Sequence, residues 1–248
     1  MNFFSLFKRN LTYKFKKKIL IDKDNVSLNT LDELFQYYGS DKSNQFKKAN
    51  RQGHGYSKFY TTYLQNYKDK KINILEIGSF AGASAAAFTK YFKNADVFCF
   101  DVNISNFKYR SKKIHVYGVD INDKKKIKKI LNQIFNKHKF NFFDLIIDDG
   151  SHNLSDILFS LNNFFKYLKA GGTFIIEDFK HPNYYQYNRD INHILVDEFL
   201  NNLKNKKFFT SSLINKEEQK NLMDSIKDID IKKGNLNDSD ICFIQKIK

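Results

Sequence analysis

The feature that most constrains the fold is an alternation of short apolar runs and longer helical patterns between about residues 72 and 180. Such an alternation is typical of βα units arranged around a parallel sheet. The segment Ala170-Gly171-Gly172 predicts a helix stop just before the fifth apolar run. The expected strands are 72–77, 96–101, 114–118, 142–147 and 173–176, and the expected helices are 83–92, 123–138 and 155–168.

The two ends of the chain add further elements. Runs at 226–231 and 241–247, separated by a turn-rich segment at 234–238, predict a closing hairpin. The fold class is therefore α/β: a doubly wound, Rossmann-like, mostly parallel seven-stranded sheet with a C-terminal antiparallel hairpin. We expect residues 1–68 to form an N-terminal helical or lid segment and residues 69–248 to form the α/β domain. Other helices are expected at 28–38, 57–67 and 191–203, with a polar loop over 39–55.

The charge balance is strongly basic, with 42 Lys and Arg against 27 Asp and Glu and a net charge of +15. Clusters of Lys and Arg are the electrostatic footprint of nucleic-acid binding. Here the chain is also crowded with Asn, Ile, Phe and Tyr, which indicates a general bias in residue usage. We interpret the run Lys124–Lys129 as the solvated side of a helix. The composition predicts no specific nucleic-acid partner, and it favours a small-molecule or glycan acceptor that carries negative charge.

The N-terminal 20 residues mix Phe and Leu with Lys and Arg, so charges interrupt each apolar stretch before it could serve as a signal core. No later run approaches the roughly 18 apolar residues that a membrane span requires. A cytoplasmic protein is expected. At its start, a packed amphipathic helix is favoured over weak contact with an anionic membrane surface. Cys99 and Cys242 lie in apolar runs and are predicted to be buried thiols rather than a disulfide.

A glycine-containing loop follows the first expected strand. Gly78 and Gly82 permit a tight turn and close approach of a ligand to the backbone, and Glu76 stands at the carboxyl end of the strand. A dinucleotide fold would want G-x-G-x-x-G, but position 80 is Phe. The loop by itself could be a simple βα turn, and the acidic residue before it favours a nucleoside ligand.

Two more carboxylates follow the next two strands. Asp101 ends the second run, 19 residues after Gly82, where its carboxylate can accept hydrogen bonds from ribose hydroxyls. Asp120 follows the third run and is placed to contact an adenine amino group. Each acid taken singly could be a loop or cap residue. As an ordered set at the ends of consecutive strands, Glu76, Asp101 and Asp120 favour nucleoside binding.

Acidic residues also follow the fourth and fifth strands. The fourth runs into a D-D-G-S-H motif at 148–152, and the fifth ends in Glu177-Asp178. Carboxylates that converge without a cation repel one another, so Asp149, Glu177 and Asp178 predict a hard ion, with magnesium favoured. His152 could take the proton of an acceptor hydroxyl. In the alternative, Asp148 and Asp149 cap the next helix and His152 is a surface residue.

With these motifs in place, residues 70–180 and the closing hairpin resemble the class I methyltransferases that use S-adenosylmethionine. The D-D-G-S-H and I-E-D pair is similar to the metal-dependent sugar O-methyltransferases of the macrocin and mycinamicin type, and to methyltransferases that modify bacterial capsules. The resemblance implies methyl transfer to a sugar hydroxyl of a capsular polysaccharide precursor or related glycoside, with S-adenosylmethionine and Mg²⁺. It implies His152 and Asp149 as catalytic residues, with His152 the base, and Asp149, Glu177 and Asp178 as metal ligands. The cofactor-binding residues that it implies are Glu76, Gly78, Ser79, Gly82, Asp101, Asp120 and Asp148.

Segments outside these motifs leave the acceptor open. Y-G-S-D-K at 38–42 and G-H-G-Y at 53–56 resemble a family pattern that would form a lid over cofactor and acceptor. His54 is either a loop residue or a binding residue, and Lys42 and Arg51 either meet an anionic group or are solvated. Tyr184, Tyr185 and Tyr187 could stack on a sugar face. The alternative functions are methylation of a phosphate or phosphoramidate oxygen, RNA methylation, and cofactor binding without catalysis.

Overall fold

The computed structural model describes residues 3–180 and 194–248. The chain divides into two compact units, Met1–Asn141 and Phe142–Lys248. The predicted boundary after residue 68, between a helical or lid segment and the α/β domain, is not the boundary between these two units. It stays a prediction. Residues 184, 185 and 187, the predicted tyrosine stretch, lie outside the described residues, as does the start of the helix expected at 191–203.

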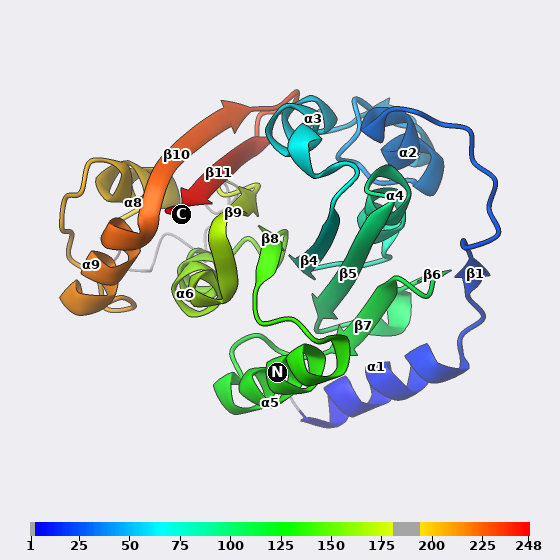
Figure 1. Cartoon of the computed structure of the whole chain (residues 1–248), viewed down its shortest axis with the longest axis horizontal. Helices are drawn as coiled ribbons and strands as arrows, with labels where there is room; N and C mark the ends of the chain where they lie inside the picture. Colours follow the sequence, from blue (N-terminus) through cyan, green and yellow to red (C-terminus); the bar gives the residue numbers. More distant parts are fainter. Residues whose placement is uncertain (1–2, 181–193) are drawn as a thin grey trace. The chain divides into compact units, whose positions relative to one another are not determined.

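Three parallel strands form the sheet of the first unit (Figure 1), in the order β4-β5-β7. They are β4 (Lys71–Ile77), β5 (Asn94–Asp101) and β7 (Ile114–Gly118), and each agrees with a predicted strand to within two residues. The connecting helices α4 (Ala83–Tyr91) and α5 (Lys124–His138) also lie where helical periodicity places them. β4 and β5 are buried on both faces apart from their first residues, one further position in β4 and two in β5, as expected for a sheet covered by helices.

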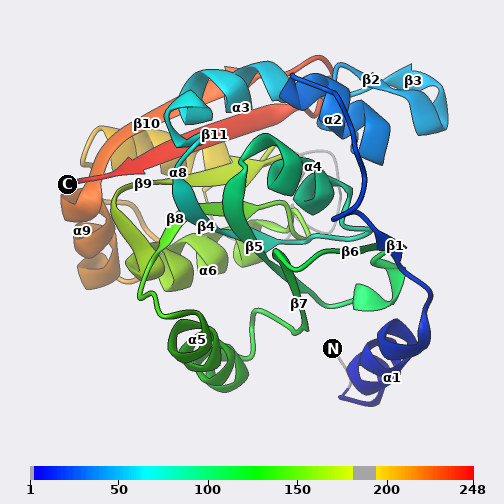
Figure 2. The same ribbon diagram turned by 45° about the vertical axis from the view of Figure 1, so that its right-hand side comes forward.

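The N-terminal part of the first unit lies beside α4 (Figure 2), and aromatic rings form the contact. Helix α2 (Leu31–Tyr38) begins with a capping box in which Thr30 and Glu33 exchange hydrogen bonds. The ring of Phe35 on α2 lies 5.5 Å from that of Phe88 on α4, and Tyr60 on α3 (Ser57–Leu64) lies 5.4 Å from Phe88. The first unit also contains two short strand pairs: β1 (Ile19–Leu20) pairs with β6 (Tyr109–Arg110), and β2 (Gln45–Phe46) pairs with β3 (Arg51–Gln52). The 3₁₀ turns are η1 (Lys47–Ala49), η2 (Gln65–Tyr67) and η3 (Ile104–Asn106).

Helix α1 (Phe3–Phe15) presents two different faces. On one face Leu6 is buried, and the Asn10 amide donates to the Gly118 carbonyl at 3.2 Å. On another face four apolar side chains are 44% to 83% exposed: Phe4, Phe7, Leu11 and Phe15. The prediction of a packed amphipathic helix is therefore confirmed for one face, and contact with a membrane surface stays a prediction. Within the described ranges, no helix has the length and apolar character needed to cross a membrane.

Four strands form the sheet of the second unit, in the order β10-β11-β9-β8. Strand β8 (Phe143–Asp148) runs parallel to β9 (Leu168–Glu177). Strand β9 is antiparallel to β11 (Asp240–Lys246). Strand β11 and β10 (Ile226–Lys233) form the predicted hairpin. The described helices of this unit are α6 (Leu154–Phe164), α8 (Val196–Lys204) and α9 (Lys216–Ser225). Helix α6 continues as the 3₁₀ turn η4 (Phe165–Tyr167). The sequence did not predict α9. The strands of the two units have the predicted α/β arrangement, mostly parallel with an antiparallel hairpin at the C-terminus.

The predicted helix stop at Ala170-Gly171-Gly172 is wrong, because these residues belong to β9. The helical segment ends at Tyr167, and the strand begins at Leu168. A register shift between β8 and β9 follows Phe143, and a Cβ built on Gly172 would lie 2.8 Å from the Asp144 carbonyl oxygen. Gly172 therefore serves a close approach between strands rather than the end of a helix.

Both cysteines are fully buried free thiols, as predicted. Cys99 lies on β5 and Cys242 on β11. Burial is the largest cause that raises the pKa of each thiol. Neither thiol is therefore ionised or reactive in the folded protein at neutral pH.

Candidate active site

The predicted cofactor loop lies between β4 and α4 in the first unit. Gly78 (φ +85°) and Gly82 (φ +76°) both have left-handed backbones, and so does Phe80 (φ +40°) between them. The N–H of Phe80 donates to Asp101 Oδ2 at 2.7 Å. The loop is therefore held against the end of β5 by one of the carboxylates that the sequence predicts for ribose. A non-glycine residue with positive φ at this point is the kind of strain found at ligand sites.

The other predicted cofactor residues of the first unit are placed at the same edge of the sheet. Glu76 is fully buried at the end of β4, and the hydroxyl of the buried Ser79 donates to the Glu76 carbonyl at 3.2 Å. Asp101 is half-buried and also accepts from the Asn103 N–H at 2.5 Å. Asp120 is half-buried and accepts from the Asn122 N–H at 3.1 Å. A carboxylate has about four lone-pair positions, so Asp101 and Asp120 keep capacity for further donors.

Strand register explains why these acids fall together. Ile77 on β4 pairs with Phe100 on β5, and Asp101 pairs with Gly118 on β7. The three strands thus end at one level, and Glu76, Asp101 and Asp120 lie within two residues of those ends. This is the carboxyl edge, at which open α/β sheets bind ligands.

The second unit gathers part of the predicted metal and base set. One ligand atom each from Asp149, His152 and Asp178 lies within 4.8 Å of the other two. His152 Nε2 is 3.7 Å from Asp149 Oδ1 and 4.0 Å from Asp178 Oδ2. Asp178 is buried, and the side chains of Asp149 and His152 are 23% and 20% exposed. We call these three residues the Asp149 cluster.

Backbone strain accompanies the Asp149 cluster. His152 (φ +56°) and Asp178 (φ +51°) both have left-handed conformations although neither is glycine. Asp178 is held there because its N–H donates to the Asp240 carbonyl at 2.8 Å. Such conformations cost of order 1–3 kcal/mol each and persist where the surrounding structure enforces them.

Asp148 is placed differently from its neighbour Asp149. It ends β8 with 3% of its surface exposed, and its Oδ1 accepts from the Gly150 N–H at 3.2 Å. Burial raises the pKa of Asp148 to about 7, against the opposite effects of the Ser160 hydroxyl, His152 and the Gly150 N–H. Its assignment to the cofactor stays a prediction.

The alternative in which Asp148 and Asp149 cap the following helix is wrong. The N-cap of α6 is Asn153, and its side chain makes no capping hydrogen bond. The Ser151 hydroxyl instead donates to Asp156 in the first turn of the helix. His152 is not a surface side chain either, since only a fifth of it is exposed.

Glu177 is the predicted ligand that the Asp149 cluster does not include. It is the last residue of β9, is 1% exposed, and pairs in register with Ile241 on β11. Its role as a metal ligand stays a prediction.

The two halves of the predicted lid motif are tied together by backbone hydrogen bonds. His54 N–H donates to the Asp41 carbonyl at 2.7 Å, and the N–H of Ser57, the residue after the second half, donates to the Lys42 carbonyl at 3.1 Å. A Cβ built on Gly53 would lie 2.1 Å from the Ser43 carbonyl oxygen, so only glycine allows this approach. The solvated alternative is wrong for Lys42, which is 2% exposed. Arg51 is exposed, and its guanidinium lies 5.4 Å from the centre of the Phe46 ring.

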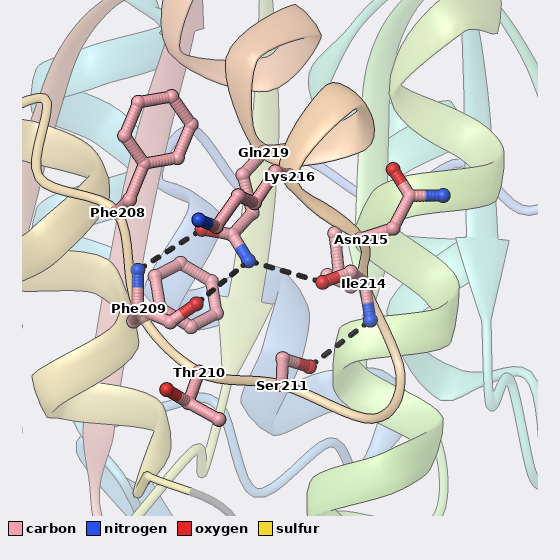
Figure 3. Close-up of a pocket in the computed structure, with 8 residues that line it drawn as sticks. All are labelled: Phe208, Phe209, Thr210, Ser211, Ile214, Asn215, Lys216 and Gln219. Atoms are coloured by element: carbon pink, nitrogen blue, oxygen red, sulfur yellow. Dashed lines mark hydrogen bonds between the residues drawn. The ribbon is translucent and has the colours of Figure 1, made fainter.

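A separate hollow lies in the second unit (Figure 3). The Gln219 side chain crosses it, donating to the carbonyls of Phe209 at 2.9 Å and Ile214 at 3.0 Å and accepting from the Phe209 N–H at 3.1 Å. These bonds fasten the segment before α9 to the helix. No residue predicted for the site lines this hollow, which is formed by Phe208, Phe209, Thr210, Ser211, Ile214, Asn215, Lys216 and Gln219.

Comparison with solved structures identifies the fold. The chain superposes on MycE, a methyltransferase from the mycinamycin biosynthetic pathway solved in complex with Mg and SAH, with a TM-score of 0.66 and 19% sequence identity. The match covers 90% of this chain and 56% of that one. This chain has the class I methyltransferase fold.

Sequence comparison finds sugar O-methyltransferases. The 8-demethyl-8-alpha-L-rhamnosyl tetracenomycin-C 2'-O-methyltransferase of Streptomyces olivaceus is 24% identical over 132 residues, 50% of this chain and 33% of the relative. The L-olivosyl-oleandolide 3-O-methyltransferase of Streptomyces antibioticus is 28% identical over 155 residues, 60% of this chain and 36% of the relative. The chain thus spans about a third of the length of the curated relatives it matches. No family model matches the chain.

Proposed function

We propose that this methyltransferase-fold chain transfers a methyl group from S-adenosylmethionine to a sugar hydroxyl, on a surface polysaccharide precursor or related glycoside. The observation that carries the proposal is the Asp149 cluster, which brings two carboxylates and an imidazole together at the ends of β8 and β9. The matched relatives are named for O-methylation of sugar-bearing compounds, which supports the acceptor class.

The first unit provides the groups that would hold S-adenosylmethionine. The loop from Gly78 to Gly82, in which Gly78, Phe80 and Gly82 have positive φ, is the segment proposed to hold the methionine part against its backbone. Asp101 and Asp120 are half-buried carboxylates with remaining acceptor capacity, suited to ribose hydroxyls and to the adenine amino group.

The donor chemistry of the Asp149 cluster fits a divalent cation. Asp149 and Asp178 supply carboxylate oxygens, the ligands that Mg²⁺ prefers, and Glu177 is the third proposed ligand. When bound, Mg²⁺ would lower the pKa of an acceptor hydroxyl, and S-adenosylmethionine would offer an electrophilic methyl group.

His152 is the proposed general base. In its neutral form the imidazole takes the proton from the acceptor hydroxyl, while the oxygen forms a bond to the methyl carbon and the bond from sulfur to that carbon breaks. Asp149 and Asp178, at 3.7 Å and 4.0 Å from Nε2, stabilise the imidazolium that results.

The strongly basic composition favours one alternative, methylation of a phosphate or phosphoramidate oxygen. Such an acceptor already carries negative charge, so the transfer needs no base. His152→Ala therefore discriminates the two reactions: it abolishes most turnover on a sugar hydroxyl and leaves turnover on a phosphate or phosphoramidate oxygen largely intact.

The experiment combines calorimetry and turnover. S-adenosylmethionine is titrated into the protein, and candidate glycosides are then titrated with Mg²⁺ present and after chelation. Asp178→Asn is compared with Asp224→Asn, an exposed acid on α9. We expect both variants to bind S-adenosylmethionine with micromolar affinity. Acceptor binding should depend on Mg²⁺ in the Asp224→Asn protein and should be lost in the Asp178→Asn protein.

Three other outcomes would change the proposal. If the acceptor binds and turns over fully without Mg²⁺, the proposed role of the metal is wrong. If the protein methylates RNA but not glycosides, the proposed acceptor class is wrong. Cofactor binding without turnover on any acceptor would indicate a non-catalytic binding protein.

A further inference from the structure

Three side chains converge at the amino-terminal edge of the sheet in the first unit, at the opposite ends of β5 and β7 from Asp101 and Gly118. Asp96 lies near the start of β5, His115 near the start of β7, and His138 is the last residue of α5. One ligand atom from each residue lies within 4.8 Å of the other two. His115 Nε2 is 2.8 Å from Asp96 Oδ1. We call these residues the Asp96 cluster; β5 and β7, which carry two of them, lie side by side (Figure 1).

An aromatic wall encloses the Asp96 cluster on one side. The Phe98 ring stacks on His115 with centroids 4.7 Å apart and meets His138 edge-on at 5.0 Å. The two imidazole centroids are 4.3 Å apart. His138 Nε2 is buried and makes no hydrogen bond within the part of the chain that the structure describes. A buried ring nitrogen without a partner is costly, and a bound ion or an ordered water would satisfy it.

Burial is the largest cause that lowers the pKa of His138, and this direction favours the neutral imidazole. Metals bind imidazole in its neutral form.

We propose that Asp96, His115 and His138 form a second metal site, which binds a transition-metal ion of the zinc class. Two imidazole nitrogens and one carboxylate oxygen suit zinc, whereas Mg²⁺ prefers oxygen ligands. Zinc bonds of about 2.0–2.1 Å place tetrahedral ligand atoms roughly 3.3 Å apart. Asp96 Oδ1 and His115 Nε2 are 2.8 Å apart, and one ligand atom of each residue lies within 4.8 Å of the others, so side-chain adjustments would bring three ligands to that spacing and leave the fourth position for water.

This proposal does not rest on methyl transfer. A metal at the Asp96 cluster would join the beginnings of β5 and β7 to the end of α5, far along the strands from the proposed cofactor loop. Its expected effect is on the stability of the first unit, because an ion that binds only the folded state stabilises that state.

The test is a zinc titration of chelator-treated full-length protein in an Asp178→Asn background, so that the Asp149 cluster is disabled. Calorimetry gives stoichiometry and affinity, and Co²⁺ substitution gives visible absorption that reports nitrogen ligation. His138→Ala removes one ligand, and Asp96→Asn removes the charge while it keeps the side-chain volume. His54→Ala is the matched control, a first-unit histidine with one carboxylate 3.9 Å away.

We expect one zinc ion per chain, and at least a tenfold weaker affinity in both His138→Ala and Asp96→Asn but not in His54→Ala. Zinc should also raise the thermal unfolding midpoint of the background protein and not that of the two variants. Mg²⁺ at equal concentration should not compete. Unchanged zinc affinity and stoichiometry in a folded Asp96→Asn protein would overturn the proposal, as would an absence of zinc binding in the background protein.

Discussion

Gly82→Ala tests whether the cofactor loop is constrained by packing as well as by backbone conformation. Gly82 has φ +76°, and a Cβ added there would lie 2.3 Å from Cζ of Phe107, a fully buried ring. A left-handed backbone costs a non-glycine residue about 1–2 kcal/mol, and overpacking a well-packed site costs about 1–3 kcal/mol. We therefore expect Gly82→Ala to lower the free energy of unfolding by about 2–5 kcal/mol.

Gly171→Ala separates the two effects. Gly171 has φ +72°, but its added Cβ would meet only Cγ of Lys248 at 3.5 Å, an ordinary contact with a flexible side chain. It should cost only the backbone contribution, about 1–2 kcal/mol. The double variant Gly82→Ala with Phe107→Leu should behave non-additively, because the smaller side chain removes the clash.

The assay is urea unfolding followed by circular dichroism, with calorimetric titration of S-adenosylmethionine on each folded variant. If Gly82→Ala and Gly171→Ala destabilise equally, to within about 0.5 kcal/mol, then Phe107 exerts no steric constraint and the reasoning is wrong.

Three further predictions concern stability and reactivity. Gln219→Leu should lower the free energy of unfolding by about 2–4 kcal/mol, because it leaves the Phe209 N–H and the carbonyls of Phe209 and Ile214 without hydrogen bonds. In the same urea experiment, substitution of the exposed Gln65 by Leu should change the free energy of unfolding by less than about 0.5 kcal/mol. Asn215→Ala should cost about 1 kcal/mol, since Asn215 forms a capping box with Glu218. Asn153→Ala should cost clearly less because that N-cap makes no side-chain hydrogen bond, and equal losses would contradict the assignment. Cys99 and Cys242 should resist iodoacetamide at pH 8 in the folded protein and react fully in urea, as mass spectrometry can count; rapid labelling of either thiol without urea would show that it is accessible.

The sequence predicted correctly those strands and helices whose apolar residues form a clear pattern over a short stretch of chain. The runs that became β4, β5, β7 and β8 are short and apolar, with turn residues on either side, and their ends could be placed within about two residues. The carboxylates at those ends were found for the same reason, since parallel strands end at one edge. A glycine pair misled the prediction at β9, because Gly171 and Gly172 serve strand pairing that depends on residues distant in sequence.

Other features of the site had no local signal. Lys42 is charged and lies in a polar segment, so nothing in the pattern indicated that it is 2% exposed. The Asp96 cluster joins residues 96, 115 and 138, which follow no metal-ligand spacing in the sequence and meet only through strand register and the end of a helix. Sequence patterns could not indicate such a cluster, because its members are neighbours only in the folded chain.

The hydrogen bond from Asp178 to Asp240 also sets an order of events during synthesis. Asp240 follows Asp178 by 62 residues, so a ribosome has already made every residue of the Asp149 cluster, and Glu177, long before this backbone contact can form. A nascent chain, or a fragment that ends before β11, therefore carries all of these side chains without the restraint that holds Asp178 in its left-handed conformation. The C-terminal hairpin contributes none of these residues, yet the geometry of the cluster can be completed only after the hairpin has paired with β9.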